Sequence, residues 1–249
     1  MEIDDKPFAA PLARLIERGE TVSESFLPHG RRVPVGNGYQ WLLRGWTMFT
    51  TAPLVWMGIA VGFMVLTLVV SATLFLTIAV NLLIPVFIGG ISIGCRAIEE
   101  GQGIRFVHLF AGFSHKLGQL LLVGVLYLLA VTLMATLVGG VVALTGAGDP
   151  SLPLLTLGFF TTIVLFVPLA MAFWLSPPLV VWHDFSALQA IRSSFFVTRD
   201  NIGPFLLYGG LVMCAAVIAS LPLLLGWLVL LPVLYASQYA FYRDVFFAQ

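Results

Sequence analysis

The sequence predicts an all-α protein, a polytopic membrane bundle of six transmembrane helices in three hairpins. Three observations support this prediction: the chain is strongly apolar, its charge-free stretches are long enough for pairs of helices, and its positive charges fall on one side of the resulting topology. Of 249 residues, 59% are hydrophobic and only 10% are charged. A water-soluble domain has roughly 25% charged residues on average, so lipid must cover much of this chain.

The first part of the chain, residues 1–40, carries scattered acidic and basic side chains among prolines and glycines. This composition predicts a soluble, flexible tail. It lacks the apolar core and small-residue cleavage site of a secretory signal, so we expect the first span to direct insertion. Residues 41–247 are expected to form the transmembrane domain.

The first apolar stretch, 53–95, contains no charged residue. It is about twice the roughly 20 residues that one helical crossing needs, which predicts two spans, 53–73 and 77–95. The turn between them falls within 71–81, where no strong Gly or Pro signal fixes its position. Because lipid offers no partner for backbone N–H and C=O groups, each span must be a helix.

The second apolar stretch, 117–182, has Asp149 as its only charge. That residue lies in a cluster of Gly and Pro turn formers, 145–153. We therefore expect spans at 119–144 and 154–175.

The third apolar stretch, 201–242, is interrupted at Pro222. Pro222 ends the sequence Ser220-Leu-Pro, and proline is a strong signal for a break between helices. The expected spans, 204–220 and 223–242, are shorter than the others and complete the set of six.

The 12 lysines and arginines fall in the N-terminal segment up to Arg44, in the loops after the second and fourth spans, and near the C-terminus. Positively charged short loops stay in the cytoplasm, so both termini are expected on the cytoplasmic side. The opposite side carries a single charge, Asp149. The positive residues are Lys6, Arg14, Arg18, Arg31, Arg32, Arg44, Arg96, Arg105, Lys116, Arg192, Arg199 and Arg243.

A short amphipathic segment rich in aromatic residues precedes each predicted hairpin. We expect three cytoplasmic-side interfacial helices whose aromatic side chains form a belt at the headgroup level. A specific lipid or partner site is the alternative interpretation. The apolar positions recur at helical spacing and are Trp41, Leu42, Gly45, Trp46 and Phe49, then Phe106, Leu109, Phe110, Phe113 and Leu117, then Leu188, Ile191, Phe195 and Phe196.

Several motifs resemble those of an uncharacterised family of six-span bacterial inner-membrane proteins over residues 40–247. They include Trp41-Leu-Leu-Arg-Gly-Trp, His108-Leu-Phe-Ala-Gly-Phe, Pro178-Leu-Val-Val-Trp-His-Asp and Tyr242-Arg-Asp. That family is similar to the YciC-like proteins and to the membrane domain of some glycerophosphodiester phosphodiesterases. The resemblance implies a multi-pass protein of the bacterial inner membrane and supplies no catalytic residues.

No chemical motif stands out in the sequence. The four histidines lack the i, i+4 spacing with a carboxylate that a helical metal site uses, and Cys95 and Cys214 match no metal or disulfide spacing. His183 is followed by Asp184, but adjacent side chains on a helix diverge, so solvation at the interface is expected instead of acid–base catalysis. We expect no catalytic, cofactor-binding or metal-binding residues, and no enzyme activity.

Two classes of function remain open. A formal net charge of zero argues against nucleic-acid binding, so the expected partners are the lipid bilayer and other membrane proteins. The first class is a non-enzymatic accessory, assembly or scaffold component. The second is a small transporter or channel for a neutral or lipid-like substrate, in which Asn81 is a candidate ligand. Ion coupling is not expected because ionisable residues are missing from the predicted spans.

Overall fold

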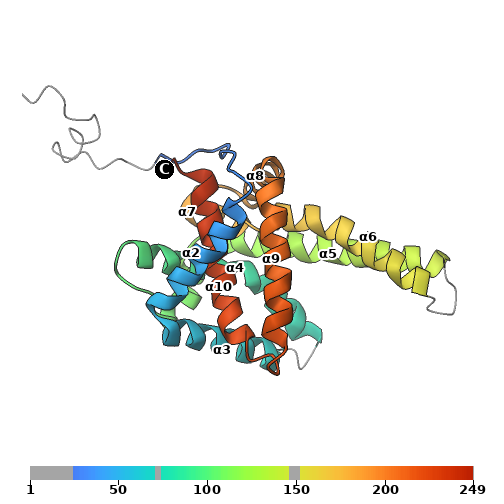
Figure 1. The fold of residues 1–249 in the computed structure, drawn as a ribbon, viewed down its shortest axis with the longest axis horizontal. Helices are drawn as coiled ribbons and strands as arrows, with labels where there is room; N and C mark the ends of the chain where they lie inside the picture. Colours follow the sequence, from blue (N-terminus) through green and yellow to red (C-terminus); the bar gives the residue numbers. More distant parts are fainter. Residues whose placement is uncertain (1–24, 71–73, 146–151, 249) are drawn as a thin grey trace, which may run out of the picture.

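The computed structural model describes residues 25–70, 74–145 and 152–248 (Figure 1). These residues are predominantly helical and include one isolated antiparallel bridge between Phe26 and Phe247. The predicted all-α class is confirmed. The first part of the predicted tail and the turn around Asp149 lie outside the described residues.

Six helices begin and end within a few residues of the six predicted spans. Three more helical segments cover most of the predicted amphipathic stretches, and a short helix continues the fourth span. In chain order they are α2 (Asn37–Thr51), α3 (Pro53–Val70), α4 (Leu74–Glu99), the 3-10 helix η1 (Phe106–Ser114), α5 (Leu117–Thr145), α6 (Leu152–Phe173), α7 (Ser176–Trp182), α8 (Ala187–Asp200), α9 (Ile202–Ser220) and α10 (Trp227–Phe246).

Four of the described helical stretches are long and apolar enough to cross a membrane: α4, α5, α6 continued by α7, and α9. A fifth results if α2 and the described part of α3 count as one span bent by 102°. Six spans are therefore not shown. Helix α10 is not among these helices because its polar residues lower its mean hydropathy. Several of these residues, including Ser237, Gln238 and Asp244, are buried inside the protein. A helix packed in this way does not need a purely apolar surface.

The bend between α2 and α3 has a local cause. Ala52 separates the two helices with φ −152° and ψ 64°, and the next residue is Pro53, the first residue of α3. A proline disfavours helical dihedrals in the residue before it and suits the first turn of a new helix. The sequence therefore directs the chain to turn here.

The junction of α6 and α7 is a second break. The backbone N–H of Leu175 donates to Ser194 Oγ at 3.1 Å, and the same hydroxyl donates to the carbonyl of Met171 at 2.7 Å. In an uninterrupted helix the Leu175 N–H would bond that carbonyl directly. The Ser194 hydroxyl from α8 thus takes a place in the hydrogen-bond ladder, which is a recognised cause of helix bending.

Helix α2 packs along α10 instead of presenting its aromatic stripe outward. Trp41, Gly45 and Phe49 are buried, and the Trp41 ring stacks on Phe241 with centroids 3.9 Å apart. A Cβ on Gly45 would lie 2.6 Å from the carbonyl oxygen of Val233. The prediction that this stripe forms part of an aromatic belt at the headgroup level is therefore corrected. Most of its residues contact protein.

Helix η1 docks on α4 at even closer range. A Cβ on Gly112 would lie 1.9 Å from the carbonyl oxygen of Val86, and one on Gly90 would lie 2.5 Å from the carbonyl oxygen of His108. The two backbones therefore touch, and only glycine fits at these points. The rings of Phe110 and Phe113 remain partly exposed and meet Phe87 edge-on.

The structure does not show the predicted bundle of three hairpins. Figure 1 shows α5 and α6 running together out to one side of the molecule, across the direction of α9. The contact of α10 is chiefly with α2, and the contact between α3 and α4 is slight. Helix α2, expected to lie on the membrane surface, packs against both α10 and α9.

Candidate functional site

Several ionic groups gather where the N-terminal segment meets the ends of α4, α7 and α10. We call this meeting place the charged junction. At its centre lies Asp244, which is 2% exposed near the end of α10. Its carboxylate accepts hydrogen bonds from Arg31 Nη2 at 2.8 Å, Asn37 Nδ2 at 2.7 Å and Trp41 Nε1 at 2.8 Å. Such pairing is what makes a buried carboxylate tolerable.

The segment before α2 is tied to the C-terminal end of α10 through its backbone as well. The N–H of Leu27 donates to the carbonyl of Phe246, and that of Arg31 to the carbonyl of Val245, both at 2.8 Å. Asn201, at the start of α9, accepts from the Val33 N–H and donates to the Arg31 carbonyl. The part of the predicted tail from residue 25 onward is therefore packed against the helices.

A polar hollow of about 580 Å³ opens beside these contacts, lined by Arg96, Glu99, Glu100, Arg243 and Phe247. Arg96 Nε donates to Glu100 at 2.8 Å, and Arg243 Nε lies 3.2 Å from Glu99. We call this space the ionic hollow. Its wall carries two positive and two negative groups.

Aromatic rings support both arginines of the ionic hollow. The Arg96 guanidinium lies 4.6 Å from the centroid of Trp182, and that of Arg243 lies 4.4 Å from the centroid of Phe247. Tyr239 donates its hydroxyl to Glu99 at 2.7 Å. Stacking on a ring holds a guanidinium plane in place, so the wall of the hollow is preorganised.

His183 and Asp184 do not lie on a helix as assumed, because both follow α7, which ends at Trp182, and their side chains have different partners. His183 Nε2 lies 2.7 Å from the Tyr242 hydroxyl, and its ring stacks on Phe26. Asp184 is exposed and forms an ion pair with Lys116. Burial, and then the nearby charges of Lys116 and Arg96, lowers the pKa of His183 to about 4. The imidazole is therefore neutral at pH 7.

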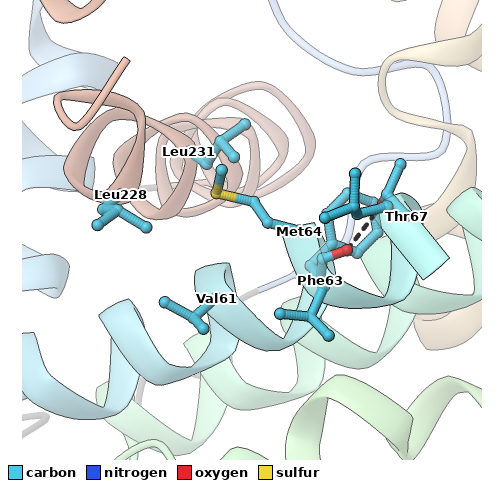
Figure 2. A pocket seen from close by; sticks show the side chains of 8 residues that line it. Val61, Phe63, Met64, Thr67, Leu228 and Leu231 are labelled. Carbon is cyan, nitrogen blue, oxygen red and sulfur yellow. Dashed lines mark hydrogen bonds between the residues drawn. The ribbon is translucent and has the colours of Figure 1, made fainter. Parts of the chain in front are cut away.

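An apolar groove of about 610 Å³ lies at the opposite end of α10, between that helix and α3. Figure 2 shows Met64 of α3 reaching toward Leu231 of α10, with Val61 and Leu228 along the walls. Thr67 supplies a hydroxyl, and it donates to the carbonyl of Phe63 within its own helix at 2.8 Å. The lining therefore suits hydrocarbon.

The sequence predicted no catalytic, cofactor-binding or metal-binding residues and did not indicate either cavity. The residues of the ionic hollow come from the ends of two helices far apart in the chain, so no local spacing links them. One signal was present: Tyr242-Arg-Asp places charges at the end of a span, and Arg96 occupies the same place on α4. Asn81, the candidate ligand of a neutral substrate, lies on α4.

No protein-family model matches the chain, and no solved structure matches it. Among curated proteins, one from Burkholderia thailandensis is 27% identical over 252 residues, covering 87% of this chain and 93% of the relative. It is described as a probable inner membrane protein, with no molecular activity in the description. This distant likeness extends over almost the whole of both chains, and the described helices long enough to cross a membrane agree with it. The chain is accordingly an integral inner-membrane protein with an all-α fold.

Proposed function

We propose that this protein is a non-enzymatic accessory or scaffold component that binds another membrane protein through the α5–α6 hairpin. The observation that carries the proposal is the exposure of this hairpin. Only 11% of the span window in α5, and 11% of that in α6 and α7, is buried in the protein, against 56% in α4. Two long apolar helices that leave the body of the molecule (Figure 1) must be covered by other membrane constituents.

Small residues on α5 favour a protein as the partner. Ala135, Gly139 and Ala143 recur at intervals of one helical turn and are all exposed, and a Cβ on Gly139 would meet nothing within 4 Å. In membranes, columns of small residues let two helix backbones approach closely. The far part of α5 therefore offers a docking face for a transmembrane helix.

The topology that we propose has six spans with both termini in the cytoplasm. Its support is the charged junction, where the N-terminal segment, the end of α4, the end of α7 and the end of α10 touch. These are the segments that the distribution of positive charge assigns to the cytoplasm. An even number of spans between two segments returns the chain to the same side of the membrane. The contact between these segments is consistent with that arrangement.

A transporter for a lipid-like substrate is the second candidate, favoured by the apolar groove between α3 and α10. Ion coupling has less support. In the described helices that qualify as spans, Asp, Glu, Lys, Arg and His occur only near the end of α4, at Arg96 and Glu99. Coupled transporters place such residues within the membrane.

Site-specific photocrosslinking tests the scaffold proposal. A photoreactive amino acid replaces Thr132, which lies on the small-residue face of α5, or Leu137, which is exposed elsewhere on the same helix. Irradiation of native membranes should give a defined protein adduct from position 132 and none from position 137. Gly139→Leu should abolish the adduct because it fills the docking face, whereas Leu129→Phe should leave it. Adducts with lipid alone at both positions would count against a protein partner.

A further inference from the structure

We propose that the ionic hollow binds the headgroup of a zwitterionic phospholipid, a phosphodiester joined to an ammonium group. The phosphate would lie between Arg96 and Arg243, and the ammonium group against Glu99 and Glu100. Phosphatidylethanolamine has this headgroup chemistry. The inference does not rest on the proposed function, because the hollow lies on α4 and α10, and the docking face lies on α5.

The position of the hollow matches the depth of lipid headgroups. Helix α4 is long and apolar enough to cross a membrane, and Arg96, Glu99 and Glu100 lie at its C-terminal end. Two of the surrounding side chains, Trp182 and Tyr239, are of the kinds that line membrane–water interfaces. A space of about 580 Å³ is in the size range of small-molecule sites.

The charge pattern selects a zwitterion over an anion. The wall holds two guanidinium and two carboxylate groups, so a simple anion gains no net attraction from it. A ligand that carries both charges can satisfy both signs, which is how electrostatic complementarity gives specificity. Arg96 uses its Nε atom toward Glu100, and a guanidinium has five N–H donors in all. A phosphate can therefore bind Arg96 without breaking its pair with Glu100.

Native mass spectrometry of the full-length protein tests the inference. Protein in detergent is titrated with phosphatidylethanolamine and with the anionic lipid phosphatidylglycerol of the same chain length. We expect a clear preference for phosphatidylethanolamine. Arg243→Gln should weaken its binding about tenfold, the loss expected for one charge-assisted hydrogen bond. Glu100→Gln, at a more exposed position, should shift the preference toward phosphatidylglycerol because the hollow then becomes net positive.

The matched control is Arg199→Gln on α8. Arg199 also pairs with a carboxylate, Asp200, and lies over an aromatic ring, Phe196, but it does not line the hollow. Its replacement should leave lipid binding unchanged. Equal binding of the two lipids, or equal losses in Arg199→Gln and Arg243→Gln, would overturn the inference. Soluble phosphoethanolamine that binds as tightly as the lipid would show that the ligand is a free headgroup and would overturn the assignment to a membrane lipid.

Discussion

The contact between Arg31 and Asp244 provides a quantitative test of how the N-terminal segment is held. Asp244 is 2% exposed and Arg31 is 32% exposed, and their side chains are 2.8 Å apart. Arg31→Gln and Asp244→Asn, made singly and together, form a double-mutant cycle that isolates the energy of the pair. The exposed pair of Arg199 and Asp200 supplies the matched cycle.

The expected magnitudes follow from burial. A hydrogen bond to a buried charged group contributes about 1.5–3 kcal/mol, so we expect a coupling energy of about 2 kcal/mol between Arg31 and Asp244. Asn37 and Trp41 continue to donate to the carboxylate in Arg31→Gln. The single change should therefore cost less than the roughly 3–5 kcal/mol of leaving a buried charge wholly unpaired. For Arg199 and Asp200, we expect less than about 1 kcal/mol, as is usual for exposed pairs.

The assay is reversible unfolding of the purified protein in mixed micelles, in which the denaturing detergent is increased and helix content is followed by circular dichroism. The free energy of unfolding is compared across each cycle. A coupling energy for Arg31 and Asp244 no larger than that for Arg199 and Asp200 would refute the assignment of residues 25–37 to the packed body of the protein.

Three further predictions use the same assay. The pKa of His183 is lowered to about 4 in the folded protein, against an ordinary value of 6.5. Between these two pH values the imidazole is protonated in the unfolded state and neutral in the folded state. Stability should therefore fall as the pH drops from about 6.5 to 4, and His183→Asn should flatten this fall; an unchanged pH profile would contradict it. Gly112→Ala should destabilise by several kcal/mol, since its Cβ would meet backbone at 1.9 Å, whereas Gly58→Ala, with open space, should be neutral or stabilising. Ser194→Ala should lower the free energy of unfolding by about 1–3 kcal/mol because the backbone N–H of Leu175 loses its partner. The control Ser193→Ala removes a buried hydroxyl that has no hydrogen-bond partner, so it should cost little. Equal losses in the two variants would contradict the account of the α6–α7 break.

Much of the helical layout is predictable from the sequence because lipid exposure imposes long apolar runs. The helix near the second predicted span begins at Leu74 and ends at Glu99, close to the predicted range 77–95. Proline and glycine then set local boundaries, as at Pro53. Such signals act within a few residues of one another, and the sequence displays them directly.

The arrangement of the helices is less predictable because it depends on contacts between distant residues. The stripe of Trp41 and Phe49 has helical spacing whether it faces lipid headgroups or α10, so periodicity alone cannot decide between them. The need for glycine at position 45 comes from its close contact with the backbone of Val233, which is distant in the sequence. The binding partners of Asp244 likewise come from residues roughly two hundred positions earlier in the chain.

The central claim is that the charged junction faces the cytoplasm and the far turn of the α9–α10 pair faces the opposite side. Cysteine labelling tests it most directly. In a variant with Cys95 and Cys214 replaced by alanine, single cysteines are placed at Glu100, Asp184 or Leu223, all of which are exposed in the structure. A membrane-impermeant maleimide should label Leu223→Cys in intact cells, and Glu100→Cys and Asp184→Cys only after the inner membrane is permeabilised. Labelling of Glu100→Cys in intact cells would contradict the topology.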